Sequence, residues 1–307
     1  MNLGVSGYMT CVLRDIRTNN EEVVVEGNNL ILNDFLDYWF TSGVPFFSPN
    51  TFHSCYIGNG RSLPVATDLG LSGSTLAVSS NGVDLEGHLY DYRNYDSEEI
   101  SYSEYVPYLA YRREWLFAAG QGSGIVSEVA VATNTGKWFA KKLLEPEFHK
   151  SQYHELRIVW EIRVTNNPIK SFIRRDSPQG LVVHWQYTNN DYQLYRLLTG
   201  EQGVWFGYSG SPQIIASDSN TQQFPINNGI NGSLVGVVGV VGVTPVVQPY
   251  AVGSSERTFI IKLESGDLNG DIGELILDKF ARITFVPLLD KNIDLTLDIP
   301  ITIRITR

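Results

Sequence analysis

Two long stretches of the chain alternate apolar residues with mostly polar ones. One covers 156–164 and the other covers 295–306. A period of two places every second side chain on the same face of a strand, so each stretch predicts a half-buried antiparallel strand. Shorter runs at 21–26 and 55–57 predict further strands. This pattern is typical of a mainly β protein.

One stretch has helical spacing instead. After a candidate cap at Asn28-Asn29, apolar residues recur three and four positions apart, which places them on one face of a helix. We therefore expect one amphipathic helix near 30–41. Its apolar face would consist of Leu32, Phe35, Leu36, Trp39 and Phe40.

The order of these features returns about 150 residues later. The run 112–129 contains an apolar strand, three glycines and a β-branched strand, and it returns more faintly at 257–274. A turn and an acidic residue in 56–68 return in 206–218, and a short helical pattern lies near 194–198. Although β proteins reuse glycine turns and alternation in any case, the shared order predicts a tandem duplication.

The duplication predicts two related antiparallel β-sandwich domains in tandem, 1–165 and 166–307, each with one short helix. Both copies keep the same strand–turn–strand frame, so we expect it to be the hairpin that builds each sandwich. We also expect the glutamate of each frame to hydrogen-bond turn N–H groups or to meet the nearby arginine. The turn residues are Arg113, Gly124 and Glu128 in the first copy and Arg257, Gly270 and Glu274 in the second.

Each half also has a segment of its own. The first contains an acidic, tyrosine-rich insertion at about 88–111, predicted to be a long loop or protruding hairpin, and the second a Gly/Val-rich segment at about 232–247. Tyrosine supplies large, stiff contact area at low entropic cost. A Gly/Val strand left exposed would template aggregation, so a partner chain could bury it. The expected interaction surface is Tyr92, Tyr95, Tyr102, Tyr105, Tyr108, Val237, Val238, Val240 and Val241, with packing inside the chain as the alternative.

Composition excludes several classes of protein. The net charge is −10, and no basic stripe is visible, which argues against nucleic acid as a partner. The longest apolar run, 234–247, is interrupted by Gly and Pro and is shorter than the roughly 20 residues of a membrane-spanning helix. No cleavable signal peptide opens the chain, so we expect synthesis in the cytoplasm. Cys11 and Cys55 are too few for a disulfide framework, and the sequence leaves open whether they pair.

The candidate chemistry is sparse. Asp267, Asn269 and Asp271 have the oxygen-ligand spacing of a calcium loop, but Ile272 stands where such a loop needs glycine, which favours a plain turn. His149 and His154 lack the spacing of a helical metal pair and are expected in a polar loop. No catalytic residue, metal or cofactor is therefore expected. One interpretation, in which Glu98, Glu99 and Glu104 hydrolyse a glycan, stays open as an alternative.

Four segments together resemble a class of tailed-bacteriophage virion proteins, labelled tail, tail-fibre or baseplate-associated proteins. They are 56–60 with Pro64, Thr67 and Asp68, then 111–120, 124–129 and 156–163. The resemblance implies a non-enzymatic structural role in the virion tail or its fibre, baseplate or neck, with a homo-oligomer and other tail proteins as partners. The second half departs from it by losing the Trp-Leu-Phe-Ala-Ala run.

Three alternatives to this role stay open. The first is a receptor- or carbohydrate-binding module of a tail fibre, with a host surface glycan as partner of the tyrosines. The others are a capsid decoration protein and a polysaccharide depolymerase.

Overall fold

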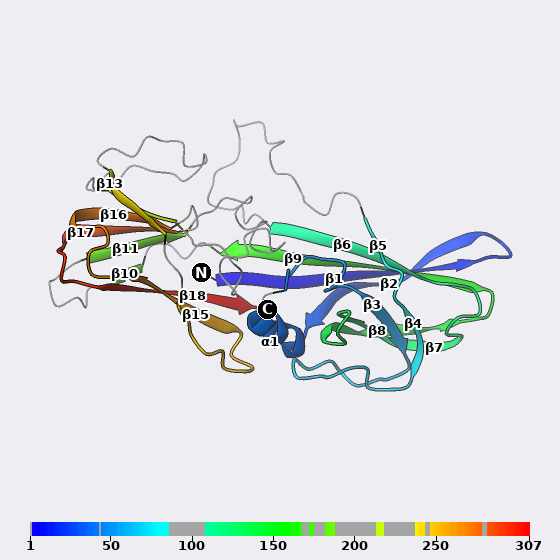
Figure 1. Ribbon diagram of the computed structural model, residues 1–307. Coiled ribbons are helices and arrows are strands. Elements are labelled where there is room, and N and C mark those ends of the chain that lie inside the picture. Colours follow the sequence, from blue (N-terminus) through cyan, green and yellow to red (C-terminus); the bar gives the residue numbers. More distant parts are fainter. Residues whose placement is uncertain are drawn as a thin grey trace, which may run out of the picture. The chain divides into compact units, whose positions relative to one another are not determined.

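The computed structural model describes residues 2–42, 44–85, 108–167, 172–174, 182–187, 213–217, 237–242, 246–277 and 281–307 (Figure 1). The chain is mainly β, as predicted, and one helix lies within the described residues. It divides into two compact units. One contains Gly4–Thr165 with Ile305–Arg307, and the other contains Asn166–Arg304 with Met1–Leu3.

The first of these units is a large curled antiparallel sheet with one helix. Its elements are β1 (Asn2–Asp15), β2 (Asn20–Ile31), α1 (Asn33–Ser42), β3 (Ser54–Gly58), β4 (Thr75–Ser79), β5 (Val83–Asp84), β6 (Tyr108–Phe117), β7 (Gly124–Ala132), β8 (Trp138–Lys150) and β9 (His154–Asn167). Neighbouring strands follow the order β5-β6-β9-β1-β2-β8-β7-β3-β4.

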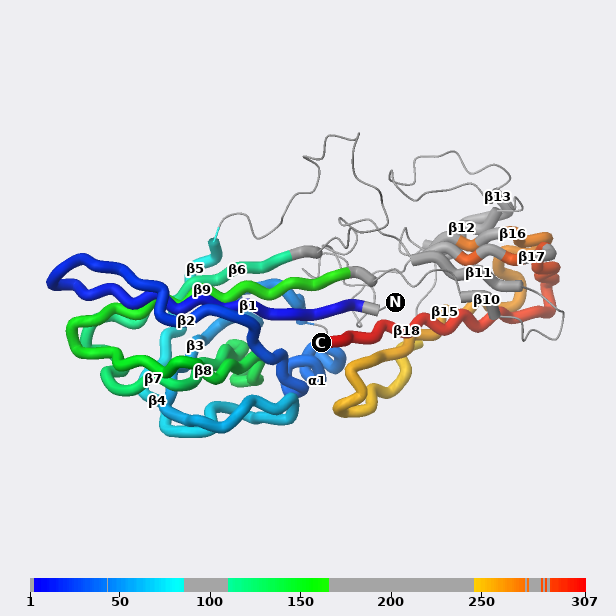
Figure 2. The backbone as a smooth tube through the Cα atoms, turned by 180° about the vertical axis from the view of Figure 1, so that it is seen from behind, coloured from blue at the N-terminus to red at the C-terminus, as the bar shows by residue number. Residues whose placement is uncertain are grey.

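The sheet curls into two layers, which both views show (Figures 1 and 2). Strands β5, β6, β9 and β1 form one layer, and β8, β7, β3 and β4 form the other. Strand β2 joins the layers, because it pairs with β1 along most of its length but with β8 only at Leu30 and Ile31. At the opposite side, the Ser79 hydroxyl donates to the carbonyl of Leu116 at 3.1 Å, which brings β4 to β6.

The run 112–129 is not a hairpin, so that prediction from the sequence is wrong. Strand β6 pairs with β5 and β9 in one layer, whereas β7 pairs with β3 and β8 in the other. The turn at 118–123 crosses between the layers, with Gly120 at φ +80° and Gly122 at φ +65°. Glycine adopts this left-handed conformation without steric cost, which allows the chain to change layers here. The turn is therefore an arch.

Helix α1 confirms the predicted amphipathic helix. Its apolar face is buried against the aromatic core, and the ring centroid of Phe35 lies 4.0 Å from that of Phe139 on β8. The helix begins at Asn33, later than the expected cap at Asn28-Asn29. The reason is that β2 continues as a strand through those asparagines and pairs with β8 before the chain turns into the helix.

The second unit contains two groups of antiparallel strands. They are β10 (Phe172–Arg174), β11 (Val182–Tyr187), β12 (Gln213–Ser217), β13 (Val237–Gly242), β14 (Val246–Val247), β15 (Glu256–Leu263), β16 (Gly270–Leu277), β17 (Ala281–Lys291) and β18 (Leu297–Thr306). One sheet has the order β10-β11-β17-β16-β12-β13, and β14, β15 and β18 pair in that order.

Strand pairs of the two units share their register. In β7–β8, Gly124 at the start of β7 pairs with Lys150 at the end of β8, and the register shifts just before Glu128. In β16–β17, Gly270 pairs with Lys291 in the same way, and the register shifts just before Glu274. The pairs β3–β4 and β12–β13 also share an equivalent register shift. The shared register places β12, not the turn at 206–210 expected from the sequence, level with β3, because Ser217 pairs with Glu274 as Gly58 pairs with Glu128. That sequence match of 56–68 with 206–218 is therefore wrong.

Some of the remaining predictions of strands, loops and helices are confirmed and others are wrong. The two alternating stretches are strands β9 and β18, as predicted. The tyrosine-rich segment was expected to be a loop up to 111, but β6 begins at Tyr108 and Tyr111 is buried within it. His149 and His154 lie in β8 and β9 rather than in a loop, because both strands extend nearly to their connecting turn. The second helical pattern, near 194–198, lies outside the described residues.

Candidate functional site

The carboxylate of Glu128 on β7 is fully buried. Its Oε1 accepts hydrogen bonds from the backbone N–H groups of Gly60 at 2.9 Å and Gly73 at 2.7 Å. Its Oε2 accepts from the backbone N–H and the hydroxyl of Ser72, both at 2.8 Å. All of these donors belong to the connection between β3 and β4, residues 59–74, called the anchored loop below. A single side chain therefore joins the beginning and the end of this loop to the sheet.

Lys141 on the neighbouring strand β8 is buried beside this carboxylate. Its Nζ lies 3.5 Å from Glu128 Oε2 and 3.1 Å from Asp68 Oδ2, in the middle of the anchored loop. The same Asp68 oxygen accepts the N–H of Val65 at 3.2 Å. Buried charges are stable only when other charges and hydrogen bonds compensate them. Here each charge has compensating partners, so the middle of the loop is tied to the sheet as well.

The hydrogen bonds control the ionisation of Glu128. Burial alone would raise its pKa, but the N–H groups of Ser72, Gly73 and Gly60 and the Ser72 hydroxyl stabilise the charged form more strongly. The pKa of Glu128 consequently lies below its ordinary value. The group is a fixed anion that orients the loop.

Glycines make room for this arrangement. A Cβ added to Gly60 would lie 2.2 Å from Glu128 Oε1 and 2.4 Å from the backbone nitrogen of Gly73. Gly70 has φ +138°, and a Cβ there would lie 3.2 Å from the ring of Trp138. Only glycine permits these close approaches of backbone to carboxylate and ring.

The anchored loop presents apolar side chains to solvent. Leu63, Val65 and Leu69 are 74%, 53% and 75% exposed. Near them, the Arg61 guanidinium donates to both carboxylate oxygens of Glu147 on β8, at 2.9 and 2.8 Å. Contiguous exposed apolar patches mark contact surfaces, whereas single exposed apolar side chains are common on any protein. The loop thus combines a rigid base with an apolar outer side, and this combination is the candidate site.

Arg113 does not meet Glu128, although the sequence offered that contact. Its Nη1 lies 2.5 Å from Asp84 Oδ1, and its Nη2 donates to the Gly82 carbonyl at 2.7 Å. The Tyr111 hydroxyl donates to the same Asp84 oxygen at 2.6 Å. Arg113 therefore holds the short strand β5 against β6.

The turn residues of the second copy are described in part. Gly270 has φ +131°, close to φ +145° at Gly124, so both strands leave their turn in the same conformation. The Arg257 guanidinium lies 6.0 Å over the ring of Phe259, and burial lowers the pKa of Arg257. Glu274 is placed by its backbone, opposite Thr284.

The three candidate calcium ligands form an ordinary turn. Asp267 Oδ2 accepts the N–H of Glu264 at 2.9 Å, Asn269 Nδ2 donates to the Gly266 carbonyl at 3.0 Å, and Asp271 is exposed. Among the described residues, no group of three His, Cys, Asp or Glu side chains is arranged to hold a metal ion.

Only Tyr108 and the four valines of the expected interaction surface lie within the described residues. Tyr92, Tyr95, Tyr102 and Tyr105, together with the carboxylates Glu98, Glu99 and Glu104, lie outside the described residues. Tyr108 is the first residue of β6. Val237, Val238, Val240 and Val241 form most of β13, at one end of its sheet.

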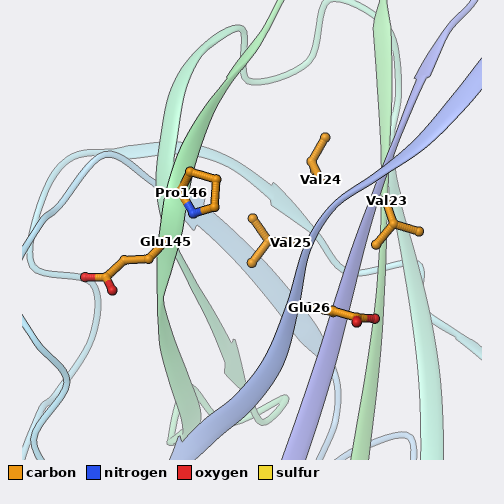
Figure 3. A pocket seen from close by; sticks show the side chains of 6 residues that line it. All are labelled: Val23, Val24, Val25, Glu26, Glu145 and Pro146. Atoms are coloured by element: carbon orange, nitrogen blue, oxygen red, sulfur yellow. The ribbon is translucent and has the colours of Figure 1, made fainter.

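An open groove of about 490 Å³ lies where β2 and β8 diverge (Figure 3). Val25 and Pro146 face it from opposite sides, and the carboxylate of Glu145 points away from it. The remaining lining residues are Val23, Val24 and Glu26. This lining exposes slightly more polar than apolar surface and contains no Ser, Thr, Cys, His or Lys side chain, so the groove has the character of a surface depression between strands.

Both cysteines are buried and free, one in each layer. Burial raises the pKa of the Cys11 thiol to about 12, and burial also raises the pKa of Cys55. A protonated, buried thiol is a poor nucleophile. These residues act as small core side chains.

The described residues contain no helix long and apolar enough to cross a membrane. Comparison with known proteins leaves the resemblance to virion proteins without further support. No protein-family model matches the chain, and no curated protein or solved structure shows a significant match to it.

Proposed function

We propose that this chain is a non-enzymatic structural protein that works by assembling with other proteins, and that the anchored loop is a contact surface. The observation that carries the proposal is the pairing of a rigid base with exposed apolar side chains. Glu128 and Lys141 are buried at the base, while Leu63 and Leu69 are about three-quarters exposed at the top.

The energetics favour a contact that forms without reordering the loop. Fully burying a leucine or valine side chain is worth about 1.5–3 kcal/mol. A flexible loop would lose part of this gain to the ordering of its backbone. Because Glu128 and Asp68 already fix the loop, Leu63, Val65 and Leu69 can contribute their burial to binding directly.

The proposed place of assembly is a bacteriophage virion, in the tail or its fibre, baseplate or neck. The support for this place is the resemblance described above. Its segments include Gly60, Asp68 and Glu128, the residues that hold the anchored loop. The proposed partners are other copies of the chain and other tail proteins, and the proposed site of synthesis is the host cytoplasm.

We further propose that the two halves are diverged copies of one β-sandwich domain. The equal register in β7–β8 and β16–β17 supports this duplication, as does the equivalent shift in β3–β4 and β12–β13. A turn feature recurs as well. The Lys150 ammonium donates to the carbonyl of Ala118, and the Lys291 ammonium to the carbonyl of Glu264, where each arch begins.

Immunogold labelling tests the virion role. Antibodies against the full chain are applied to purified tailed particles from the source culture, with particles of an unrelated phage as the control. Gold on the tails of the source particles is the expected result. Unlabelled tails, with the chain recovered only from the particle-free lysate, would reject the proposal.

A further inference from the structure

Strand β13 lies at the end of its sheet. It pairs with β12 on one side, and among the described residues no strand pairs with it on the other. An edge strand offers unpaired N–H and C=O groups to any second chain, and proteins normally protect such edges with charges, prolines or covering segments. Residues Val237–Gly242 contain neither a charge nor a proline. The register shift leaves Val238 as an extra residue, a β-bulge that β4 shares at the equivalent place, so the bulge does not distinguish the two edges.

The equivalent edge in the other unit is protected. Strand β4 occupies the place of β13, because Val78 pairs with Tyr56 in the same register as Val240 with Ile215. The Gln121 side-chain amide donates to the Val78 carbonyl at 3.0 Å, and β4 is also held to β6 by Ser79. The outward-facing carbonyl of β4 is therefore satisfied within the chain.

The residue that would protect β13 in the same way cannot do so. Asp267 occupies the place of Gln121: its side chain accepts the N–H of Glu264, just as the Gln121 side chain accepts the N–H of Ala118. A carboxylate has no hydrogen to donate, so Asp267 cannot satisfy the carbonyl of Val240. The change from amide to carboxylate leaves the edge of β13 without this protection.

The sequence of the edge is complementary to itself. Within β13, residues 237–241 read Val-Val-Gly-Val-Val in both directions, with Gly239 at the centre. If two copies pair antiparallel about a two-fold axis at Gly239, each of these valines lies opposite a valine and Gly239 lies opposite its own copy. Cross-strand pairs of β-branched residues stabilise antiparallel sheets. A two-fold contact requires this kind of self-complementarity.

Charge also favours a second copy at this place. The chain has a net charge of −10, so two copies repel each other over most of their surface. No charged residue lies between Asp218 and Glu256. The edge of β13 lies within this neutral stretch, so the pairing strands themselves add no charge repulsion.

We propose that β13 is the contact through which two copies of this chain associate, by antiparallel pairing of their β13 strands about Gly239. This inference rests on the assembly role proposed above and deepens it, because it names a second copy as the partner. The anchored loop in the other unit remains available for different proteins.

Cysteine cross-linking tests the register. Residues opposite each other in an antiparallel pair have Cα atoms about 4.5–5.5 Å apart, within the range of a disulfide. Gly239→Cys in the full chain should therefore form a covalent dimer under mild oxidation, as the two thiols lose two electrons to the oxidant. Val237→Cys is the matched control, since its two copies would be about 13 Å apart. Equal cross-linking of both variants, or none by Gly239→Cys, would overturn the register.

A charge at the edge tests the contact itself. Val240→Lys should weaken self-association at least about tenfold, measured by sedimentation equilibrium of the full chain, because it puts one lysine of each copy at a position next to the two-fold axis. Val78→Lys, at the equivalent place on the protected strand β4, should leave it unchanged. If Val240→Lys does not fold, as judged by circular dichroism, the cross-linking result decides.

The self-association measurement and the immunogold labelling together show whether β13 pairing or the virion role fails. A wild-type chain that stays monomeric at about 100 μM, well above the Kd of a stable contact, rejects β13 pairing while immunogold labelling of tails upholds the virion role. Unlabelled tails with an intact β13 dimer would instead reject the virion role and uphold β13 pairing.

Discussion

At the scale of single residues, the central group is the buried Glu128. It is a charged side chain inside a β core, and such a group is retained only where its surroundings replace water completely. Three backbone N–H groups, one hydroxyl and the Lys141 ammonium do so here. The consequence is a loop whose position depends on one side chain.

Replacing this carboxylate by an amide tests that dependence. Glu128→Gln puts an NH₂ group against N–H donors and leaves Lys141 buried with less compensation. We expect a loss of about 3–5 kcal/mol in the free energy of unfolding, the usual cost of breaking a buried pair. Urea denaturation measures it. Glu147→Gln, in the exposed pair with Arg61, is the matched control and should cost less than about 1 kcal/mol. Equal losses in the two variants would contradict this role of Glu128.

The pKa of Glu128 predicts a pH dependence of stability. Because this pKa is lowered in the folded state, the carboxylate stabilises the fold fully above its ordinary pKa of 4.5. The stabilisation is lost as pH falls through the lower folded-state pKa. The difference in unfolding free energy between wild type and Glu128→Gln should therefore shrink as pH falls below about 4. Urea titrations at a series of pH values measure this difference, and one that stays constant down to about pH 3 would rule out the proposed ionisation.

The sequence indicated part of this site. Glu128 was expected to hydrogen-bond turn N–H groups or to meet Arg113, and its partners are N–H groups of the loop at 59–74. The contribution of Lys141 could not be predicted, since a lysine at a strand position is usually exposed. Its burial depends on Asp68, which lies far away in sequence and reaches it only through the fold.

At the scale of elements, the anchored loop depends on the absence of side chains at its glycines. Gly60→Ala places a methyl group 2.2 Å from Glu128 Oε1, so we expect a loss of about 2–4 kcal/mol and faster proteolysis of the loop. Gly120→Ala is the control: it has open space around it but φ +80°, and should cost only about 1 kcal/mol of backbone strain. Thermal unfolding with limited proteolysis measures both effects. A Gly60→Ala variant as stable as wild type would show that the loop is not tightly held.

The outer side of the same loop should matter for assembly and not for folding. Leu63→Ser, Val65→Thr and Leu69→Ser combined should change the unfolding free energy by less than about 1 kcal/mol, because these side chains are mostly in water. The variant should fail to co-sediment with assembled tails. Val252→Ser with Ile293→Ser, at positions 81% and 65% exposed outside the loop, is the matched control. Co-sedimentation equal to wild type would remove the loop from the interface.

Strands were easier to predict from this sequence than the layer to which each belongs. The alternation in 156–164 depends on local burial, so it identified strand β9 correctly. The arch at 118–123 has the glycines of a hairpin, yet its flanking strands pair with distant partners. Pairing of that kind is decided by the whole core, and no local pattern reports it. The exposure of Leu63, Val65 and Leu69 could not be predicted either, because they stand in a stretch rich in turn residues that has no regular apolar pattern.

At the scale of the whole molecule, two strand pairs of the first unit share their register with two pairs of the second, and the two units differ elsewhere. The first copy ties its β3–β4 connection down through Glu128 and presents it. The second copy carries the uncharged strand β13 at a sheet edge. We infer that duplication supplied two scaffolds and that assembly uses a different surface on each.

Electron cryomicroscopy of purified tailed particles from the source culture would show whether the anchored loop is a contact surface in the virion. We predict density for this chain in the tail, with Leu63, Val65 and Leu69 buried against a neighbouring protein. A map in which the chain occupies the tail but the anchored loop faces solvent on every copy would contradict the proposed role of the loop. Particles that lack the chain would contradict the virion role itself.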